Sequence, residues 1–126
     1  MYTSIMRYLA VAFGGSVGAV LRYALATQIG RLNTRFPLGT FVINITGSMF
    51  LGWFLTYVGR HHVSEATRLA IAVGFVGAYT TFSTFMYESN HLADEGAGFE
   101  SIMNLLGSLI VGIVAVRVGM MLARWR

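Results

Sequence analysis

Four apolar stretches follow one another along the chain, with short polar segments between them. They cover roughly residues 5–29, 38–58, 69–87 and 99–122, and the middle two contain no charged residue. Each reaches the length of about 20 residues with which a helix crosses the hydrocarbon core of a bilayer. Lipid offers the backbone no hydrogen bonds, so stretches of this kind are helical. The pattern therefore predicts an all-α integral membrane protein of four transmembrane helices, forming a single membrane domain over residues 1–126.

The connections between these stretches are too short to hold a water-soluble domain. They comprise residues 30–37, 59–67 and 90–98. Four crossings place both termini on one side of the membrane. The arginines on that side only mildly outnumber those on the other side, so the positive-inside rule leaves insertion in both orientations open. The function is expected to lie within the membrane.

Composition agrees with a membrane protein and narrows the classes of function. Hydrophobic residues make up 56% of the chain and charged residues 11%, whereas an ordinary soluble domain is about 25% charged. All nine basic residues are arginines, and the formal net charge is +4. Because these arginines stand singly at the edges of apolar stretches and form no basic stripe, we expect membrane lipid as a partner and no nucleic acid.

The sequence contains no arrangement typical of an enzyme. It has no cysteine, which excludes disulfides and thiolate chemistry. His61 and His62 are adjacent in a loop, so on a helix they would not face one metal ion together, and they are more simply interpreted as an interfacial loop feature. We therefore expect no enzymatic activity.

Small residues are frequent in three of the four stretches. They are Gly14, Gly15, Gly18 and Ala19 in the first, Gly47, Ser48 and Gly52 in the second, and Gly107, Ser108 and Gly112 in the fourth. Small residues let membrane helices approach closely. Packing within one subunit explains most of them. Their surplus, in a bundle too small to shield a pathway from lipid, favours a homo-oligomer, most simply a two-fold dimer.

Residues 74–85, in the third stretch, form the most informative segment. Four hydroxyl residues, Thr80, Thr81, Ser83 and Thr84, lie within five positions and close to Gly77. Hydroxyl side chains often bond back to their own helix. Clustered beside a glycine, they also permit a broken helix whose free carbonyl groups face a polar site. Such carbonyl groups suit a hard cation such as Na⁺.

Phe82 and Phe85 are three residues apart and share one face of a helix. Contact with lipid or with the protein core is the ordinary explanation for such a pair. The polar residues around the pair suggest a second explanation, which is that the two rings bind an anion. The electropositive edge of an aromatic ring attracts an anion without a formal charge. Several weak donors hold a small, strongly hydrated anion loosely enough for it to pass.

Four further polar residues have two interpretations each. The amide of Asn44 either joins helices or donates to an anion. Arg22 either extends to the membrane surface or raises the anion concentration at a pore mouth. Glu88 is either an interfacial carboxylate or part of a vestibule. Ser108 is either a packing residue or one polar group of a path.

Three segments together resemble a known family. They are residues 14–23 (GGSVGAVLRY), 39–47 (GTFVINITG) and 74–85 (GFVGAYTTFSTF). They are similar to the signatures of the Fluc-type fluoride channels, the CrcB family. The resemblance covers nearly the whole chain in length, number of spans and order of motifs. It implies passive export of cytoplasmic fluoride through the plasma (inner) membrane of a prokaryote, which relieves fluoride toxicity.

The resemblance also implies an assembly and a set of site residues. The assembly is an antiparallel, dual-topology homodimer with a broken third helix, two pores, and a structural Na⁺ at its centre. The backbone carbonyl groups of Gly77 and Thr80 in both subunits would hold this ion. The family pattern assigns Phe82, Phe85 and Asn44 to the pores, Arg22 to the vestibule, and Thr81, Ser83 and Thr84 to the break or the path; Ser108 joins the expected path and Glu88 the vestibule.

The sequence departs from the family pattern at three positions. Ala78 replaces a common second glycine, Tyr79 replaces an aliphatic residue, and Asn104 stands where a tyrosine is common.

Two other classes of membrane protein have this size. A proton-coupled small multidrug transporter needs a carboxylate inside the membrane, and no acidic residue lies at the centre of a span. A non-transporting subunit of a membrane complex would not need the polar cluster at residues 80–84.

Overall fold

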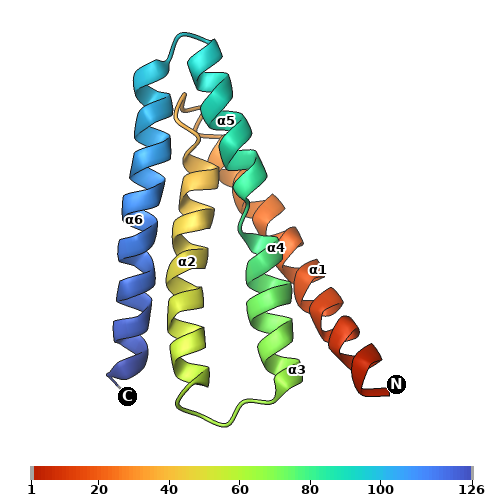
Figure 1. The fold of residues 1–126 in the computed structure, drawn as a ribbon. Helices are drawn as coiled ribbons and strands as arrows, with labels where there is room; N and C mark the ends of the chain where they lie inside the picture. Colours follow the sequence, from red (N-terminus) through yellow and green to blue (C-terminus); the bar gives the residue numbers. More distant parts are fainter. Residues whose placement is uncertain (1, 126) are drawn as a thin grey trace.

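The computed structural model describes residues 2–125, so residues 1 and 126 of the predicted domain lie outside it. All regular secondary structure of the described chain is helical, and it forms four long rods (Figure 1). Three rods are single helices, and the third consists of four consecutive helical segments. Their bounds are α1 (Tyr2–Gly30), α2 (Leu38–Val58), α3 (Glu65–Arg68), η1 (Leu69–Val76), α4 (Gly77–Tyr79), α5 (Phe82–Asp94) and α6 (Gly98–Arg124).

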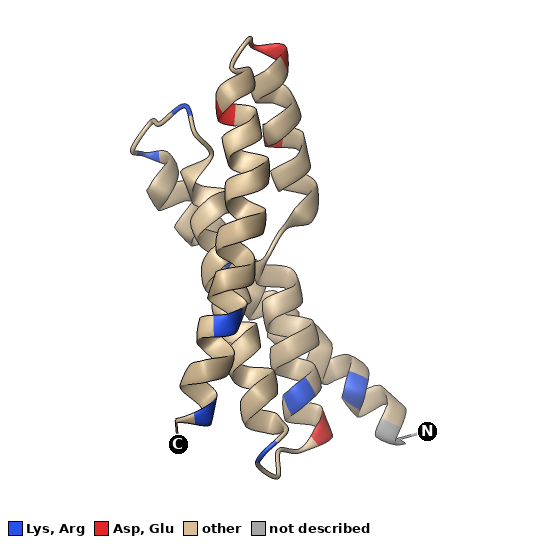
Figure 2. Cartoon of the chain, turned by 60° about the vertical axis from the view of Figure 1, so that its left-hand side comes forward, with Lys and Arg blue, Asp and Glu red and all other residues tan. Residues whose placement is uncertain are grey.

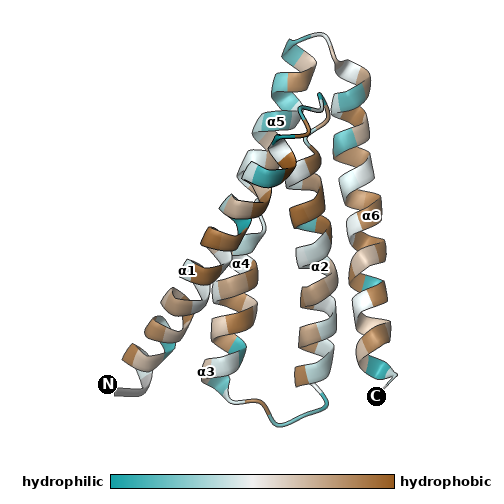
Figure 3. Ribbon diagram, turned by 180° about the vertical axis from the view of Figure 1, so that it is seen from behind, coloured by the Kyte–Doolittle hydropathy of each residue, from teal (hydrophilic) through white to brown (hydrophobic). Residues whose placement is uncertain are grey.

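The four predicted membrane spans are confirmed as helices. Four stretches are long and apolar enough to cross a membrane, namely Ser4–Gly30, Leu38–Val58, Glu65–Asp94 and Gly98–Arg124. Figure 3 shows hydrophobic residues along the middle of the rods and hydrophilic residues toward their ends. Both termini lie at the same end of the bundle, as an even number of crossings requires (Figure 1).

The third connection is shorter than the sequence pattern suggested. Residues 90–94 continue α5 as helix, and only residues 95–97 form the turn to α6. The turn closes with a hydrogen bond from the Ala97 N–H to the Leu92 carbonyl at 2.8 Å. Gly96 has a φ of +77°, the left-handed conformation that ends many helices and that glycine adopts without strain. The polarity of residues 90–94 therefore reflects the exposed end of a helix.

Figure 2 shows most acidic residues at the end of the bundle where α5 meets α6, and basic residues toward both ends as well as along the rods between them. Four of the five acids belong to α5, its turn or the start of α6. At the opposite end, Arg7 of α1 and Glu65 of α3 form an ion pair at 2.9 Å. Charges thus lie mostly where water or headgroups reach them.

Close backbone contacts hold the rods together. α1 crosses η1 and α4, whereas α2 runs beside α6. A side chain at Gly14 or Gly18 of α1 would collide with backbone carbonyl groups of the third rod. Gly52 of α2 and Gly119 of α6 have the same relation across the other pair. The expectation that small residues serve packing within the subunit is therefore confirmed for Gly14, Gly18 and Gly52, and Gly119 is a further packing glycine that sequence reasoning did not name.

The third rod is interrupted in its middle, as the sequence predicted. Thr80 and Thr81 have extended backbones, with ψ of 158° and 115°, and the helix resumes at Phe82. Gly77 itself is helical, with φ −60° and ψ −36°. The break therefore falls three residues beyond the glycine, at the hydroxyl pair. Figure 1 shows the break as the thin, non-helical link between α4 and α5.

Candidate functional site

The break in the third rod is held by the amide of Asn44 on α2. The Oδ1 atom of Asn44 accepts from the Thr81 N–H at 2.9 Å, and its Nδ2 donates to the Thr81 carbonyl at 3.0 Å. The Asn44 Oδ1 thus replaces the helical acceptor that the Thr81 N–H would have had in a continuous helix. The second Nδ2 hydrogen of Asn44 is not needed for this pairing.

Thr81 also caps the helix that follows the break. Its Oγ1 accepts from the Thr84 N–H at 3.3 Å and donates to the Thr84 Oγ1 at 2.9 Å. The N-terminus of α5 is therefore formed inside the membrane-spanning region. A helix N-terminus carries partial positive charge on N–H groups that have no helical partner. The surroundings of Phe82 are thus electropositive without any charged side chain.

A first cavity of about 200 Å³ lies against the break. Its lining is uncharged and consists of Asn44, Gly47, Ser48, Leu51, Val76, Thr80, Thr81 and Phe82. A second cavity, of about 300 Å³, also has Thr81 in its lining. It is lined by Ala19, Arg22, Tyr23, Ala26, Thr40, Ile43, Thr81, Thr84 and Glu88. Thr81 contributes to both cavities.

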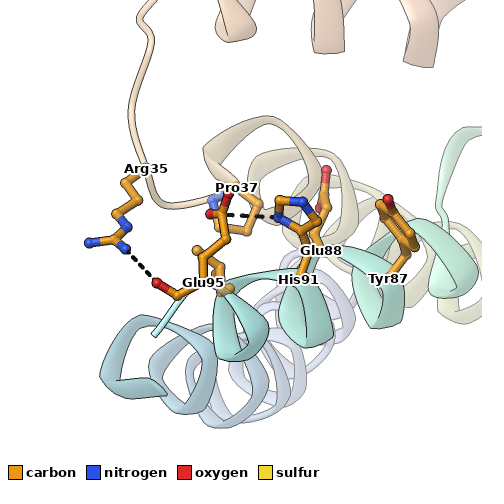
Figure 4. A pocket seen from close by; sticks show the side chains of 7 residues that line it. Arg35, Pro37, Tyr87, Glu88, His91 and Glu95 are labelled. Carbon is orange, nitrogen blue, oxygen red and sulfur yellow. Dashed lines mark hydrogen bonds and ion pairs between the residues drawn. The ribbon is translucent and has the colours of Figure 1, made fainter. Parts of the chain in front are cut away.

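A third cavity, of about 280 Å³, continues toward the end of α5 (Figure 4). Arg35, Glu88, His91 and Glu95 supply its charged and titratable groups. His91 Nδ1 lies 3.6 Å from a Glu95 carboxylate oxygen, and Arg35 donates to the Glu95 carbonyl at 3.4 Å. Glu88 lines both this cavity and the second one. The three cavities therefore form a series along α5, in which the first two share Thr81 as a lining residue and the last two share Glu88.

The polar residues predicted for one site are mostly gathered along this series. Thr81 and Asn44 meet at the break, and Arg22, Thr84 and Glu88 line one cavity. Ser83 is exposed and lines none of the three cavities. Ser108 lies on α6 and donates to Asn104 Oδ1 at 3.4 Å, also away from these cavities. The roles expected for these residues remain predictions.

The two phenylalanines are neighbours at the start of α5. Their ring centroids are 6.2 Å apart, with the planes tilted by 54°. Phe82 is 74% exposed in the single subunit, whereas Phe85 is half-buried. Phe82 therefore presents most of its ring to whatever covers this surface, be it lipid or a second protein chain.

The carbonyl groups of Gly77 and Thr80 are available as oxygen ligands. In an unbroken helix the Gly77 carbonyl would accept from the Thr81 N–H, which donates to Asn44 instead. Gly77 is exposed on the surface of the subunit. Within residues 2–125 there is no group of three His, Asp or Glu side chains able to hold a metal ion. Backbone oxygens are thus the ligands that this region offers a hard cation.

Sequence reasoning missed the buried polar residues Thr40, Ser89 and Ser101, and it named Asn104 without recognising that its side chain is buried. Thr40, one turn before Asn44 on α2, is 7% exposed and lines the second cavity. Ser89, Ser101 and Asn104 are 2%, 6% and 0% exposed and join α5 to α6. The signal for the α6 residues was present, because positions 101, 104 and 108 form a polar stripe at helical spacing in an apolar helix.

Comparison with known proteins places the chain among relatives of one kind. The family described as CrcB-like protein, Camphor Resistance (CrcB), matches residues 9–120. The chain belongs to the CrcB family. A relative from Acidobacterium capsulatum named "Fluoride-specific ion channel FluC" is 50% identical over 117 residues, which cover 91% of this chain and 94% of the relative. The prediction that the family is CrcB is confirmed.

Other relatives with this family's channel name extend the range of organisms. One from Solibacter usitatus is 42% identical over 94% of this chain and 99% of its own length. Another, "Fluoride-specific ion channel FluC 1" from Methanosarcina acetivorans, is 40% identical over 94% of this chain and 88% of its own length. These prokaryotic CrcB relatives and the four apolar helices fit a multi-pass protein of the plasma membrane. Because the relatives are named as ion channels, the family also agrees with the prediction of a non-enzymatic protein.

Proposed function

We propose that this chain is a subunit of a passive fluoride channel that lets cytoplasmic fluoride leave the cell. The observation that carries the proposal is the series of cavities along α5, which starts at an uncharged polar break and has charged residues in the second and third cavities. The names of the CrcB relatives identify the ion.

Anion recognition at the break would rest on weak donors. The free Nδ2 hydrogen of Asn44, the threonine hydroxyl groups and the edges of Phe82 and Phe85 each attract an anion without a full positive charge. Partial charges of this kind permit an ion both to enter a site and to leave it. Arg22, beside the second cavity, would raise the local anion concentration.

We further propose that the working unit is an antiparallel, dual-topology homodimer with two pores. A four-helix subunit leaves Phe82 and Gly77 exposed, so a path along α5 needs a second wall to separate it from lipid. A second copy related by a two-fold axis in the membrane plane would supply that wall for both subunits at once. The modest arginine imbalance between the two ends is compatible with insertion in both orientations.

A structural Na⁺ at the dimer centre belongs to the same proposal. The Gly77 carbonyl does not accept from the Thr81 N–H, because this N–H donates to Asn44 instead. At Thr80 the backbone is extended, so the Thr80 carbonyl does not point along the helix axis. Such neutral oxygens fit a hard monovalent cation. When bound, the ion would supply a fixed positive charge that holds the two broken helices together.

Proton-coupled transport is the principal alternative. It requires a carboxylate that binds a proton at the heart of the transport site. The cavity at the break has no acidic residue, and Glu88 lies two turns further along α5. This separation favours an uncoupled channel.

The decisive experiment measures ion release from liposomes that contain the purified protein. A fluoride electrode follows efflux after a potassium ionophore is added, and matched liposomes loaded with chloride serve as the control. We expect rapid fluoride release, little chloride release, and no dependence on a proton gradient. Absence of fluoride release from folded protein would refute the channel, and release that needs a proton gradient would favour the transporter.

A further inference from the structure

Three buried polar side chains join α5 to α6 just beyond Phe85. Asn104 Nδ2 donates to the Ser89 Oγ at 2.9 Å, and Ser101 Oγ donates to the Ser89 carbonyl at 2.7 Å. Asn104 is fully buried and Ser89 is 2% exposed. In an apolar helix pair, polar groups this deeply buried are retained only if they are hydrogen-bonded. The contact is therefore a directional one.

The network reaches the backbone of a proposed pore residue. The hydroxyl of Ser89 accepts from Asn104 and passes its own hydrogen to the Phe85 carbonyl at 2.8 Å. Hydrogen bonds in such a chain strengthen one another. These hydrogen bonds thus connect α6, through Ser89, to Phe85, whose ring centroid lies 6.2 Å from that of Phe82.

This fixation matters because α5 has lost continuity with the helix before it. The backbone is extended at Thr80 and Thr81, so the earlier half of the rod does not determine the rotation of α5 about its axis. Two asparagines hold it instead. Asn44 on α2 fixes Thr81, the residue that caps α5, and Asn104 on α6 fixes α5 one turn beyond Phe85. The phenylalanine pair lies between these two anchors.

The geometry points to Asn104 and Ser89 as positioning residues that set the orientation of the Phe85 ring in the channel. This role rests on the proposed function, because the orientation of the Phe85 ring affects transport only if the ring lines the path of the ion. Both side chains are buried between α5 and α6, so neither is expected to touch the ion. Their effect on transport would pass through α5.

The test places 4-fluorophenylalanine at position 85 and reads its ¹⁹F resonance in the detergent-solubilised full-length protein. Ser89→Ala removes the bond to the Phe85 carbonyl, and Asn104→Ala removes the bond that orients the Ser89 hydroxyl. We expect both changes to shift or broaden the resonance of the ring. Fluoride efflux should fall by about fivefold, the effect of losing one hydrogen bond of ordinary strength. Ser89→Thr keeps the hydroxyl and should restore both readouts.

Ser16→Ala is the matched control. Ser16 Oγ donates to the Ala12 carbonyl at 2.8 Å, the same back-bond that Ser89 makes, but without a partner on another helix. It should leave the ring resonance and the efflux rate unchanged. A second probe, placed at position 82, should move less than the probe at position 85, because Asn44 still holds the start of α5.

The outcomes separate positioning from simple stabilisation. An unchanged resonance at position 85 in both folded variants would overturn the proposal, even if the proteins melted at lower temperature. If Asn104→Ala does not fold, Ser89→Ala alone decides, since it deletes only one oxygen atom. If the wild-type protein releases no fluoride, the channel function fails, while the ¹⁹F comparison still decides whether Asn104 and Ser89 orient the ring.

Discussion

The two halves of the third membrane span are built on different physical principles. The half before the break, η1, is apolar throughout and packs against α1 at glycines that bring backbones into contact. The half after it, α5, is held by side-chain hydrogen bonds from Asn44 and Asn104. Apolar packing gives a rigid scaffold but has no directional contacts. Hydrogen bonds between specific atoms, in contrast, fix the rotation and the position of a helix. The proposed ion path follows the second half.

The largest effect is expected from a single methyl group in the packed half. A Cβ at Gly18 would collide with the backbone carbonyl of Phe75. Because the colliding atoms belong to the backbone, a change of side-chain rotamer cannot relieve the clash. Gly18→Ala should therefore cost about 3 kcal/mol or more and sharply reduce the yield of monodisperse protein in size-exclusion chromatography. Gly107→Ala is the matched control, because nothing lies within 4 Å of a Cβ at that position. Equal yields of the two variants would contradict the packing argument.

An intermediate effect is expected at the break itself. Asn44→Ala leaves the N–H and carbonyl of Thr81 without the partners they have at 2.9 and 3.0 Å. In a membrane protein, two such bonds contribute about 1–2 kcal/mol together, which a thermal melt in detergent would detect. Asn44→Asp removes the donor and adds negative charge beside the first cavity, so fluoride efflux should fall by at least about tenfold. Survival of efflux in both variants would make Asn44 a packing residue only.

A change at Phe82 should separate transport from folding. The ring is 74% exposed in the subunit, so Phe82→Ile keeps an apolar surface and should alter stability by no more than about 0.5 kcal/mol. It removes the electropositive ring edge, and fluoride efflux should be lost while the dimer remains. The measurement pairs electrode-detected efflux with size-exclusion chromatography. Unchanged efflux would remove Phe82 from the path.

Removal of Na⁺ tests how the two broken rods are joined in the proposed dimer. If the carbonyl groups of Gly77 and Thr80 hold the ion, replacing Na⁺ by N-methyl-D-glucamine should weaken the dimer, because these neutral dipoles would face one another without a cation between them. Dilution in detergent followed by crosslinking would measure the dimer fraction. The same fraction with and without Na⁺ would contradict the sodium site.

The sequence predicted the spans because each depends on its own composition. It predicted the break for a related reason, since hydroxyl residues clustered beside a glycine are a local signal. That signal covers residues 77–84 and does not fix one position, whereas the interruption lies at Thr80 and Thr81. The position is decided by Asn44, 37 residues earlier, whose amide takes the backbone groups of Thr81. A partner so distant in sequence cannot be read from the motif.

The same limit explains the residues that sequence reasoning missed. Ser89 is an ordinary helical serine until Asn104, 15 residues later, donates to it. Tyr79, noted only for its size, is 6% exposed and places its hydroxyl 2.8 Å from the Thr46 Oγ1. In each case the residue type was visible, and its role depended on which helix lies opposite. Residue types and periodicity therefore predicted the helices, and tertiary contacts decided the site.

The smallest effect is expected at the ion pair that joins α1 to α3, where the third span begins. Arg7 and Glu65 lie 2.9 Å apart, and both side chains are 49% exposed, so solvent and salt screen their attraction. Arg7→Gln should lower stability by no more than about 0.5 kcal/mol, and the loss should vanish at about 1 M salt, where the screening length is only ~3 Å. Arg68→Gln removes the same charge from α3, at the same end of the bundle, and is the control for net charge. Thermal melts of both variants at low and high salt make the comparison. A destabilisation by Arg7→Gln as large as that by Gly18→Ala would mean that charge, rather than backbone packing, holds the first half of the third span against α1.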